Sequence, residues 1–131
     1  MKKISVLLVV ILLLNAFTGC RKQDSPINMT NADSFSIYYG VSSYALFGSD
    51  KDTLKALSDS FDDLSFEATN KQMDIFSMLS IRFFTDEKQI SEVNVDKNGV
   101  FWLNGNTECL KIATGSFNYN DIKDIYEKSK E

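Results

Sequence analysis

Carboxylates are the side chains of this sequence that could perform chemistry without other residue types. One carboxylic acid and one carboxylate suffice to hydrolyse a glycosidic bond, and several together provide the oxygen ligands that Ca²⁺ prefers. The acidic residues gather in one predicted helix and in two compact pairs: Asp50, Asp52, Asp59, Asp62 and Asp63, then Asp86-Glu87, and Asp121 with Asp124. Helix starts and exposed helix faces also favour acids for folding alone. We therefore predict no catalytic residue and no metal or other cofactor, and keep a small carboxylate-dependent hydrolase as an alternative.

The segment Asn94-x-Asp96-x-Asn98-Gly99 has the spacing of the first half of an EF-hand calcium loop. That loop also needs a bidentate glutamate at its twelfth position, which is Gly105 here. Helices flank an EF-hand loop, whereas the flanks here alternate between apolar and polar residues as strands do. The segment therefore predicts a tight hairpin turn, since Asn and Gly tolerate the positive φ that such turns require.

Cysteine and histidine usage limits the remaining chemistry, because the 131-residue chain contains two cysteines and no histidine. Without histidine, Ser-His-Asp catalysis, Cys-His catalysis and imidazole metal sites are excluded. A reactive thiol needs a base or a positive neighbour, and Cys109 has only Lys111 nearby in the sequence. We predict that Cys109 is a small buried apolar residue. The net charge of −4 excludes a nucleic-acid partner, which would require a basic surface.

The N-terminus has the character of a signal peptide. Lys2 and Lys3 precede an apolar run over 4–14 that only Ser5 interrupts. As a helix this run is about 16 Å long, roughly half the thickness of the hydrocarbon core of a bilayer. It is too short to span a membrane permanently and has the length of a signal-peptide core, so residues 1–19 are predicted to be a signal peptide.

The next residues are Phe17-Thr18-Gly19-Cys20, in which small residues directly precede a cysteine. This segment resembles the lipobox of bacterial lipoproteins, with Phe17 where Leu is usual. The resemblance implies cleavage between Gly19 and Cys20, a diacylglycerol on the sulfur of Cys20, and an acyl chain such as palmitate on its amino group. Two or more chains hold a protein stably at the cell membrane, here on its extracytoplasmic face. The alternatives are an uncleaved anchor or an ordinary secretory signal with an incidental cysteine.

Residues 20–34 join the predicted lipidated cysteine to the domain and show no apolar periodicity. They contain Pro26, the only proline of the chain, and we predict a flexible spacer. Removing residues 1–19 takes away Lys2 and Lys3 but no acid, so the remaining chain is more acidic than the precursor. An anionic membrane surface would repel such a chain, which leaves the lipid to hold it there.

Residues 35–131 are predicted to form a single α+β domain, since 44% of the sequence is apolar and its length suits one core. Alternation predicts strands over 35–47 (with Gly40 as a bend), 65–69, 75–84, 90–95, 100–103 and 107–113. Helical spacing of apolar residues predicts helices from Ser49 to Leu64 and after Asn118 or Asn120. The order β-α-β-β-β-β-β-α predicts an antiparallel sheet of about five to six strands with two amphipathic helices.

Aromatic residues are further candidates for contact with a partner, because a ring can leave one face exposed. Tyr38 and Tyr44 alternate with serines, so we name both as surface-contact residues. Phe76 and Phe84 are predicted to lie in the core, and Trp102 belongs to the same group of candidates.

The sequence thus predicts a lipid-anchored extracytoplasmic binding or interaction module of unknown ligand, with an envelope protein or a glycan as its partner. One alternative is a small carboxylate-dependent hydrolase of the cell envelope. Another is an inhibitor or immunity-type lipoprotein that caps a partner enzyme, which would present a contiguous exposed aromatic patch.

Overall fold

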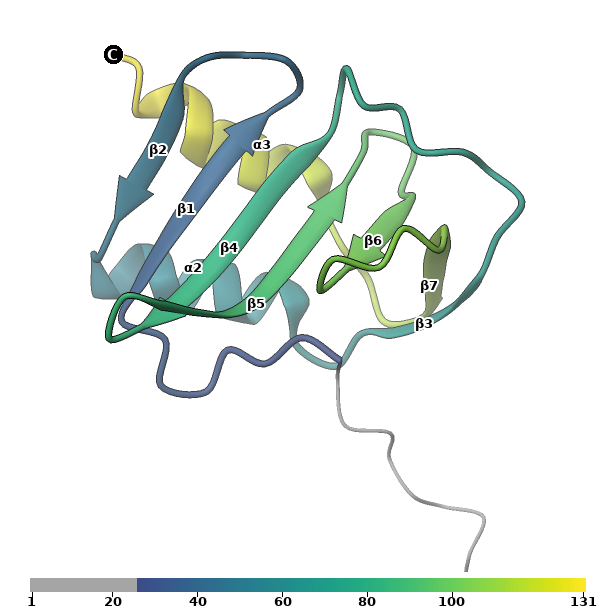
Figure 1. Ribbon diagram of the computed structural model, residues 1–131, viewed down its shortest axis with the longest axis horizontal. Coiled ribbons are helices and arrows are strands. Elements are labelled where there is room, and N and C mark those ends of the chain that lie inside the picture. The colour runs from purple at the N-terminus through teal and green to yellow at the C-terminus, as the bar shows by residue number, and fades with distance from the viewer. Residues whose placement is uncertain (1–25) are drawn as a thin grey trace, which may run out of the picture.

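The computed structural model describes residues 26–131, which form one antiparallel sheet with two helices on one of its faces (Figure 1). The predicted signal peptide, its cleavage after Gly19 and the lipid attachment at Cys20 lie outside the described residues. Within residues 26–131, neither helix is long and apolar enough to cross a membrane.

Seven strands and two helices build the domain, labelled here as in Figure 1. In chain order they are β1 (Ser34–Tyr39), β2 (Ala45–Gly48), α2 (Lys51–Phe61), β3 (Ser65–Ala68), β4 (Leu79–Thr85), β5 (Lys88–Val95), β6 (Phe101–Leu103), β7 (Leu110–Thr114) and α3 (Tyr119–Lys128). The strand order across the sheet is β2-β1-β4-β5-β6-β7-β3, and every neighbouring pair is antiparallel. The predicted α+β class, with two helices on an antiparallel sheet, is confirmed.

The first predicted strand is in fact two strands joined by a turn, so the order begins β-β-α. Gly40 has a φ of +50°, and its N–H donates to the carbonyl of Met78 at 2.7 Å. The chain reverses there, and β2 returns antiparallel to β1 as the sheet edge. The reversal also changes which residues face inward. Leu46 packs on the core while Phe47 is 67% exposed, although simple alternation placed Phe47 beside Phe35.

The core lies between the sheet and the helices. Alternate strand residues and the apolar stripes of both helices are almost fully buried there: Phe35, Ile37, Ile81, Phe83, Val93 and Phe101 from strands, and Leu57, Phe61, Ile122 and Tyr126 from helices. Burying each such side chain contributes about 1.5–3 kcal/mol to folding. The N-cap of α2 is Asp50, one residue after the predicted start at Ser49. The N-cap of α3 is Asn118, one of the two residues predicted for that position.

The predicted flexible spacer ends earlier than residue 34, because residues 26–33 pack on the domain. Ile27 is only 4% exposed and belongs to the core cluster. The carbonyl of Pro26 accepts a hydrogen bond from Asn104 Nδ2 at 2.8 Å, and Asp33 Oδ2 accepts one from the N–H of Asp86 at 2.8 Å. We call this side of the domain the proximal end: residues 26–34 with the turns at 86–87 and 104–106.

Candidate functional site

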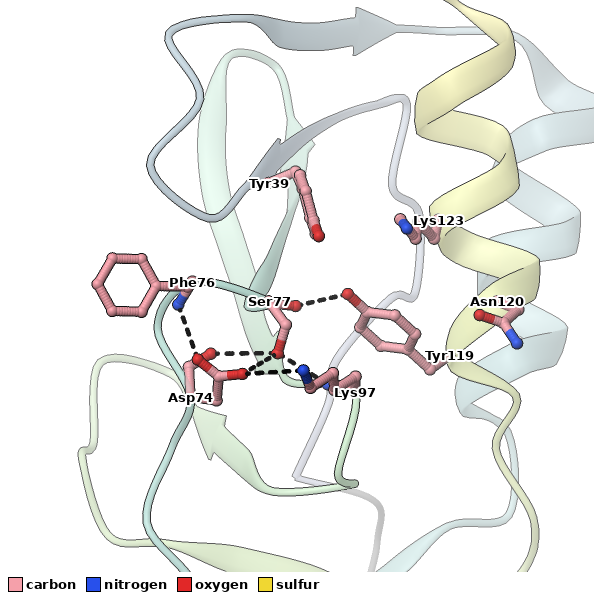
Figure 2. A pocket seen from close by; sticks show the side chains of 8 residues that line it. All are labelled: Tyr39, Asp74, Phe76, Ser77, Lys97, Tyr119, Asn120 and Lys123. Carbon is pink, nitrogen blue, oxygen red and sulfur yellow. Dashed lines mark hydrogen bonds and ion pairs between the residues drawn. The ribbon is translucent and has the colours of Figure 1, made fainter.

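A polar cavity lies at the other end of the strands (Figure 2), which we call the distal end: residues 40–44, 70–78 and 96–99 with the start of α3. Its volume is about 470 Å³, within the usual range for small-molecule sites. The residues that line it come from four separate segments: Tyr39, Asp74, Phe76, Ser77, Lys97, Tyr119, Asn120 and Lys123. Antiparallel pairing explains why they meet, since β1 and β5 end where β4 begins.

Asp96 holds the β5–β6 hairpin and the 70–78 loop together at the distal end. Its carboxylate is fully buried and accepts backbone N–H bonds from Asn98 and Val100, both at 2.9 Å, within the β5–β6 hairpin. Its other oxygen accepts the N–H of Asp74 at 2.8 Å, which ties the 70–78 loop to that hairpin. The predicted hairpin turn is therefore confirmed, and the carboxylate of Asp96 is engaged by the backbone.

Asp74 organises the loop that precedes β4. Its Oδ1 accepts the N–H of Phe76 at 3.1 Å, and its Oδ2 accepts the hydroxyl of Ser77 at 2.9 Å. The Ser77 hydroxyl is the main reason that the pKa of Asp74 is held below its usual value, with help from the Phe76 N–H and the positive charge of Lys97. These side-chain bonds to the backbone compete with strand pairing. This is why β4 begins at Leu79 and not at the predicted residue 75.

Tyr119 closes the cavity from the α3 side. Its hydroxyl donates to the carbonyl of Ser77 (Figure 2), which joins the first turn of α3 to the loop. Burial raises the pKa of Tyr119 well above its usual value, and the nearby Tyr39 and carboxylates add to the shift. The phenol therefore stays neutral and brings no negative charge into the cavity.

Two lysines supply the positive charge of the cavity. Lys97 Nζ lies 3.8 Å from Asp74 Oδ2, near the limit of an ion pair. Lys123 Nζ lies 5.4 Å from the centre of the Tyr39 ring, and no carboxylate of residues 26–131 forms an ion pair with it. Because both carboxylates of this region already accept hydrogen bonds, the arrangement favours binding an electron-rich group over acid–base catalysis.

Comparison of the chain with protein-family models, with curated proteins and with solved structures finds no match. Within residues 26–131, no three cysteine or carboxylate side chains are grouped so that they could hold a metal ion. What this cavity binds must therefore be inferred from its own chemistry.

The two predicted contact residues, Tyr38 and Tyr44, do not line the cavity. Tyr38 lies half-buried on the sheet face without helices, where its ring meets Phe47 edge-on at 6.0 Å and Arg82 lies 5.0 Å from its centre. Tyr44 is 38% exposed and donates to the carbonyl of Ser129 after α3. The structure therefore places them in separate environments instead of on one surface.

The prediction that Phe76 belongs to the core is wrong, because its ring is 70% exposed. It lies in the loop at the rim of the cavity and not in a strand. Phe84 and Trp102 are half-buried, and the indole N–H of Trp102 donates to Cys109 Sγ at 3.4 Å. Cys109 is itself half-buried and not fully enclosed.

Several of the acidic residues considered as chemical candidates pair with a neighbouring side chain or form a turn. Asp59 pairs with Lys55 at 2.6 Å on the exposed face of α2. Asp86 and Glu87 form an exposed turn with positive φ, and Asp121 Oδ1 accepts a bond from the Asn118 amide at the start of α3. Sequence reasoning missed Lys97 and Lys123. The clearest local signal for the site was the Asp74-x-x-Ser77 spacing, typical of a side-chain-capped turn.

A second hollow of similar volume opens at the edge of the sheet, lined mainly by Phe35, Phe47, Gly48 and Phe84. Its walls are aromatic and it contains one charged residue, Glu87. Its polar lining residues are Ser34, Ser49 and Glu87, fewer than those that line the cavity at the distal end. The cavity at the distal end is therefore the better candidate.

Proposed function

We propose that the protein is a binding module anchored by lipid on Cys20 to the extracytoplasmic face of the cell membrane, and that its ligand occupies the cavity at the distal end. The observation that carries the proposal is the place of that cavity. It lies beyond the last residue of β1, whereas the chain from the predicted anchor meets the domain before the first residue of β1. Figure 1 shows the segment that precedes β1 at one end of the strands and the loops of the cavity at the other.

Distances support this arrangement. Six residues of β1 separate the two ends by about 20 Å. The connection from Cys20 to Pro26 can reach at most about 20 Å in any conformation, and Pro26 is bound to the domain through Asn104. An anchor at Cys20 would therefore keep the proximal end within about 20 Å of the bilayer, with the cavity about 20 Å further along the strands.

Exposed apolar residues at the distal end also support a binding role. Val41 is 77% exposed, Ile75 48% and Phe76 70%. Their two loops touch, since the N–H of Gly40 donates to the carbonyl of Met78. Apolar side chains that gather at a polar rim are characteristic of a contact surface.

The two alternatives have less support. A hydrolase needs a carboxylate that is available to act as acid or base, and Asp74 and Asp96 are both engaged in hydrogen bonds. A capping inhibitor was expected to show one aromatic patch. Within residues 26–131, the most exposed phenylalanines are Phe47 and Phe76, which instead lie toward opposite ends of β1.

Intact mass analysis of the protein extracted from membranes tests the anchor. We expect a chain that begins at Cys20 and carries the added mass of a diacylglycerol, and a Cys20→Ala variant without that mass. A wild-type chain with residues 1–19 still attached and no lipid mass would contradict the proposal.

A further inference from the structure

We propose that the cavity at the distal end recognises a carboxylate or phosphate group of a soluble small molecule, held between Lys97 and Lys123. This inference rests on the proposed function and names the ligand class of the same site. The two ammonium groups come from different elements, the β5–β6 hairpin and α3, and both line one cavity (Figure 2).

The positive charge of the cavity is only partly neutralised from within. Among residues 26–131, Asp74 is the only acidic residue that lines it, and it pairs with Lys97 at 3.8 Å. The charge of Lys123 is left without a carboxylate partner from those residues. Lys123 is half-buried, and its Nζ lies 5.4 Å from the centre of the Tyr39 ring. A partly desolvated ammonium that faces an aromatic ring gains further from an anion in the cavity.

Neutral donors and an apolar rim complete the site. Asn120 presents its side-chain amide from the same helix turn as Tyr119, and amides bind oxygen acceptors without adding charge. Phe76 stands at the rim with most of its ring in solvent, and Figure 2 shows this ring directed away from the two lysines. Charged and neutral donors together suit a small acid with several oxygen atoms, such as an acidic sugar.

The anchoring bilayer is a poor source of this anion. The proximal end would lie near the membrane, and the cavity opens about 20 Å further along the strands. An anionic phospholipid headgroup of the same membrane could enter the cavity only if the whole domain turned over on its tether. We commit to a soluble acid, and a lipid headgroup becomes an outcome that the experiment must exclude.

The test uses the full lipidated chain, labelled with ¹⁵N, in nanodiscs of phosphatidylcholine. Glucuronate, glucose and inorganic phosphate are titrated separately, and the amide signals of Lys97, Asn120 and Lys123 are followed. We expect saturable shifts with glucuronate and phosphate, and none with glucose. Lys97→Gln and Lys123→Gln should each weaken glucuronate binding by on the order of tenfold. Lys128→Gln is the matched control, because it removes the same charge from the exposed end of α3 and should change affinity less than twofold.

Three results would overturn the inference. Equal shifts with glucose and glucuronate would show that charge is not recognised. Equal weakening by Lys128→Gln would show that the anion responds only to surface charge. Shifts that appear only when phosphatidylglycerol is added to the nanodisc would assign the site to lipid. Each of these results is independent of the lipid mass on Cys20, so failure of the ligand class is distinguishable from failure of the anchor.

Discussion

Apolar loop residues lie at both ends of the strands, but the two ends treat them differently. At the proximal end, Ile27 is 4% exposed and seals the core beside the start of the sheet. At the distal end, Val41 and Phe76 are 77% and 70% exposed. Folding explains the first arrangement, since a buried side chain contributes stability. It does not explain the second, which costs solvation and gains no packing. The difference separates residues that build the domain from residues available for contact.

For polar side chains the exposed example lies at the proximal end and the buried example at the distal end. The proximal end is fastened by Asp33, an exposed residue whose carboxylate accepts the N–H of Asp86 and the hydroxyl of Ser34. The distal end is fastened by Asp96, which is fully buried and accepts three backbone N–H bonds. A buried polar frame therefore supports the exposed cavity, while surface bonds suffice where the chain joins the domain.

Removing the buried frame should have the largest effect on stability. Asp96→Ala leaves three backbone N–H groups without their acceptor, and we expect the free energy of unfolding to fall by about 3–5 kcal/mol. Urea unfolding measures the change. Asp33→Ala serves as the comparison at the proximal end and should cost less, because water can replace its carboxylate. A larger loss for Asp33→Ala would reverse the contrast between the two ends.

Replacing one isoleucine at each end with alanine tests the difference in burial between apolar residues at the two ends. Ile27→Ala opens a hole in the core and should lower the free energy of unfolding by about 2–4 kcal/mol. Ile75→Ala at the distal end removes a side chain that is 48% exposed, and we expect a change within about 0.5 kcal/mol. Chemical unfolding measures both losses, and a loss for Ile27→Ala as small as that expected for Ile75→Ala would mean that residues 26–33 are not part of the folding unit.

Alanine substitutions at two glycines with positive φ distinguish the cost of backbone strain from the added cost of a steric clash. Gly40→Ala must keep a φ of +50° and would place its Cβ 2.4 Å from the carbonyl oxygen of Phe76. Gly105→Ala keeps a φ of +78° at the proximal end but meets nothing within 4 Å. We expect the first variant to lose about 2–3 kcal/mol and the second about 1 kcal/mol. Thermal unfolding gives both values, and equal midpoints would show that the loops at 40 and 76 do not touch.

Lowering the pH should weaken the carboxylate hydrogen bonds at both ends and so lower the free energy of unfolding. We expect this effect to be smaller than those of the substitutions above. The Ser77 hydroxyl lowers the pKa of Asp74, and the Asp86 N–H lowers that of Asp33. Each carboxylate therefore stabilises the fold above the usual value of 3.8, and this contribution is lost as the pH falls through the lower folded pKa. Asp74→Asn and Asp33→Asn should each flatten the loss of stability below that pH. Lys97→Gln should raise the pKa of Asp74 alone, as carboxyl NMR titration would show; an equal rise for Asp33 would contradict this.

The sequence predicts the parts of the fold that repeat and misses those that depend on single contacts. Period-two alternation identifies the strands of the meander, and the spacing of Ile122 and Tyr126 identifies α3. The β1–β2 hairpin is missed because Gly40 reverses the chain without interrupting the alternation. Ile27 is missed because one apolar residue in a polar stretch has no period.

The candidate site is harder to predict for a different reason. Its lysines, Lys97 and Lys123, belong to segments that are distant in the sequence and meet only when the strands pair. No local spacing indicates such a meeting. The predicted contact residues Tyr38 and Tyr44 were chosen from local alternation, and they therefore identify exposed or half-exposed surface and not the cavity.

The central claim, that the anchor and the cavity lie at opposite ends, is tested most directly by the distance of each end from the bilayer. Nanodiscs that contain a lipid with a nitroxide headgroup would broaden the amide signals of nearby residues in the lipidated chain. We predict strong broadening at Gly105 and little at Asn98, which belongs to the distal hairpin. Equal broadening at both residues, or stronger broadening at Asn98, would contradict the account.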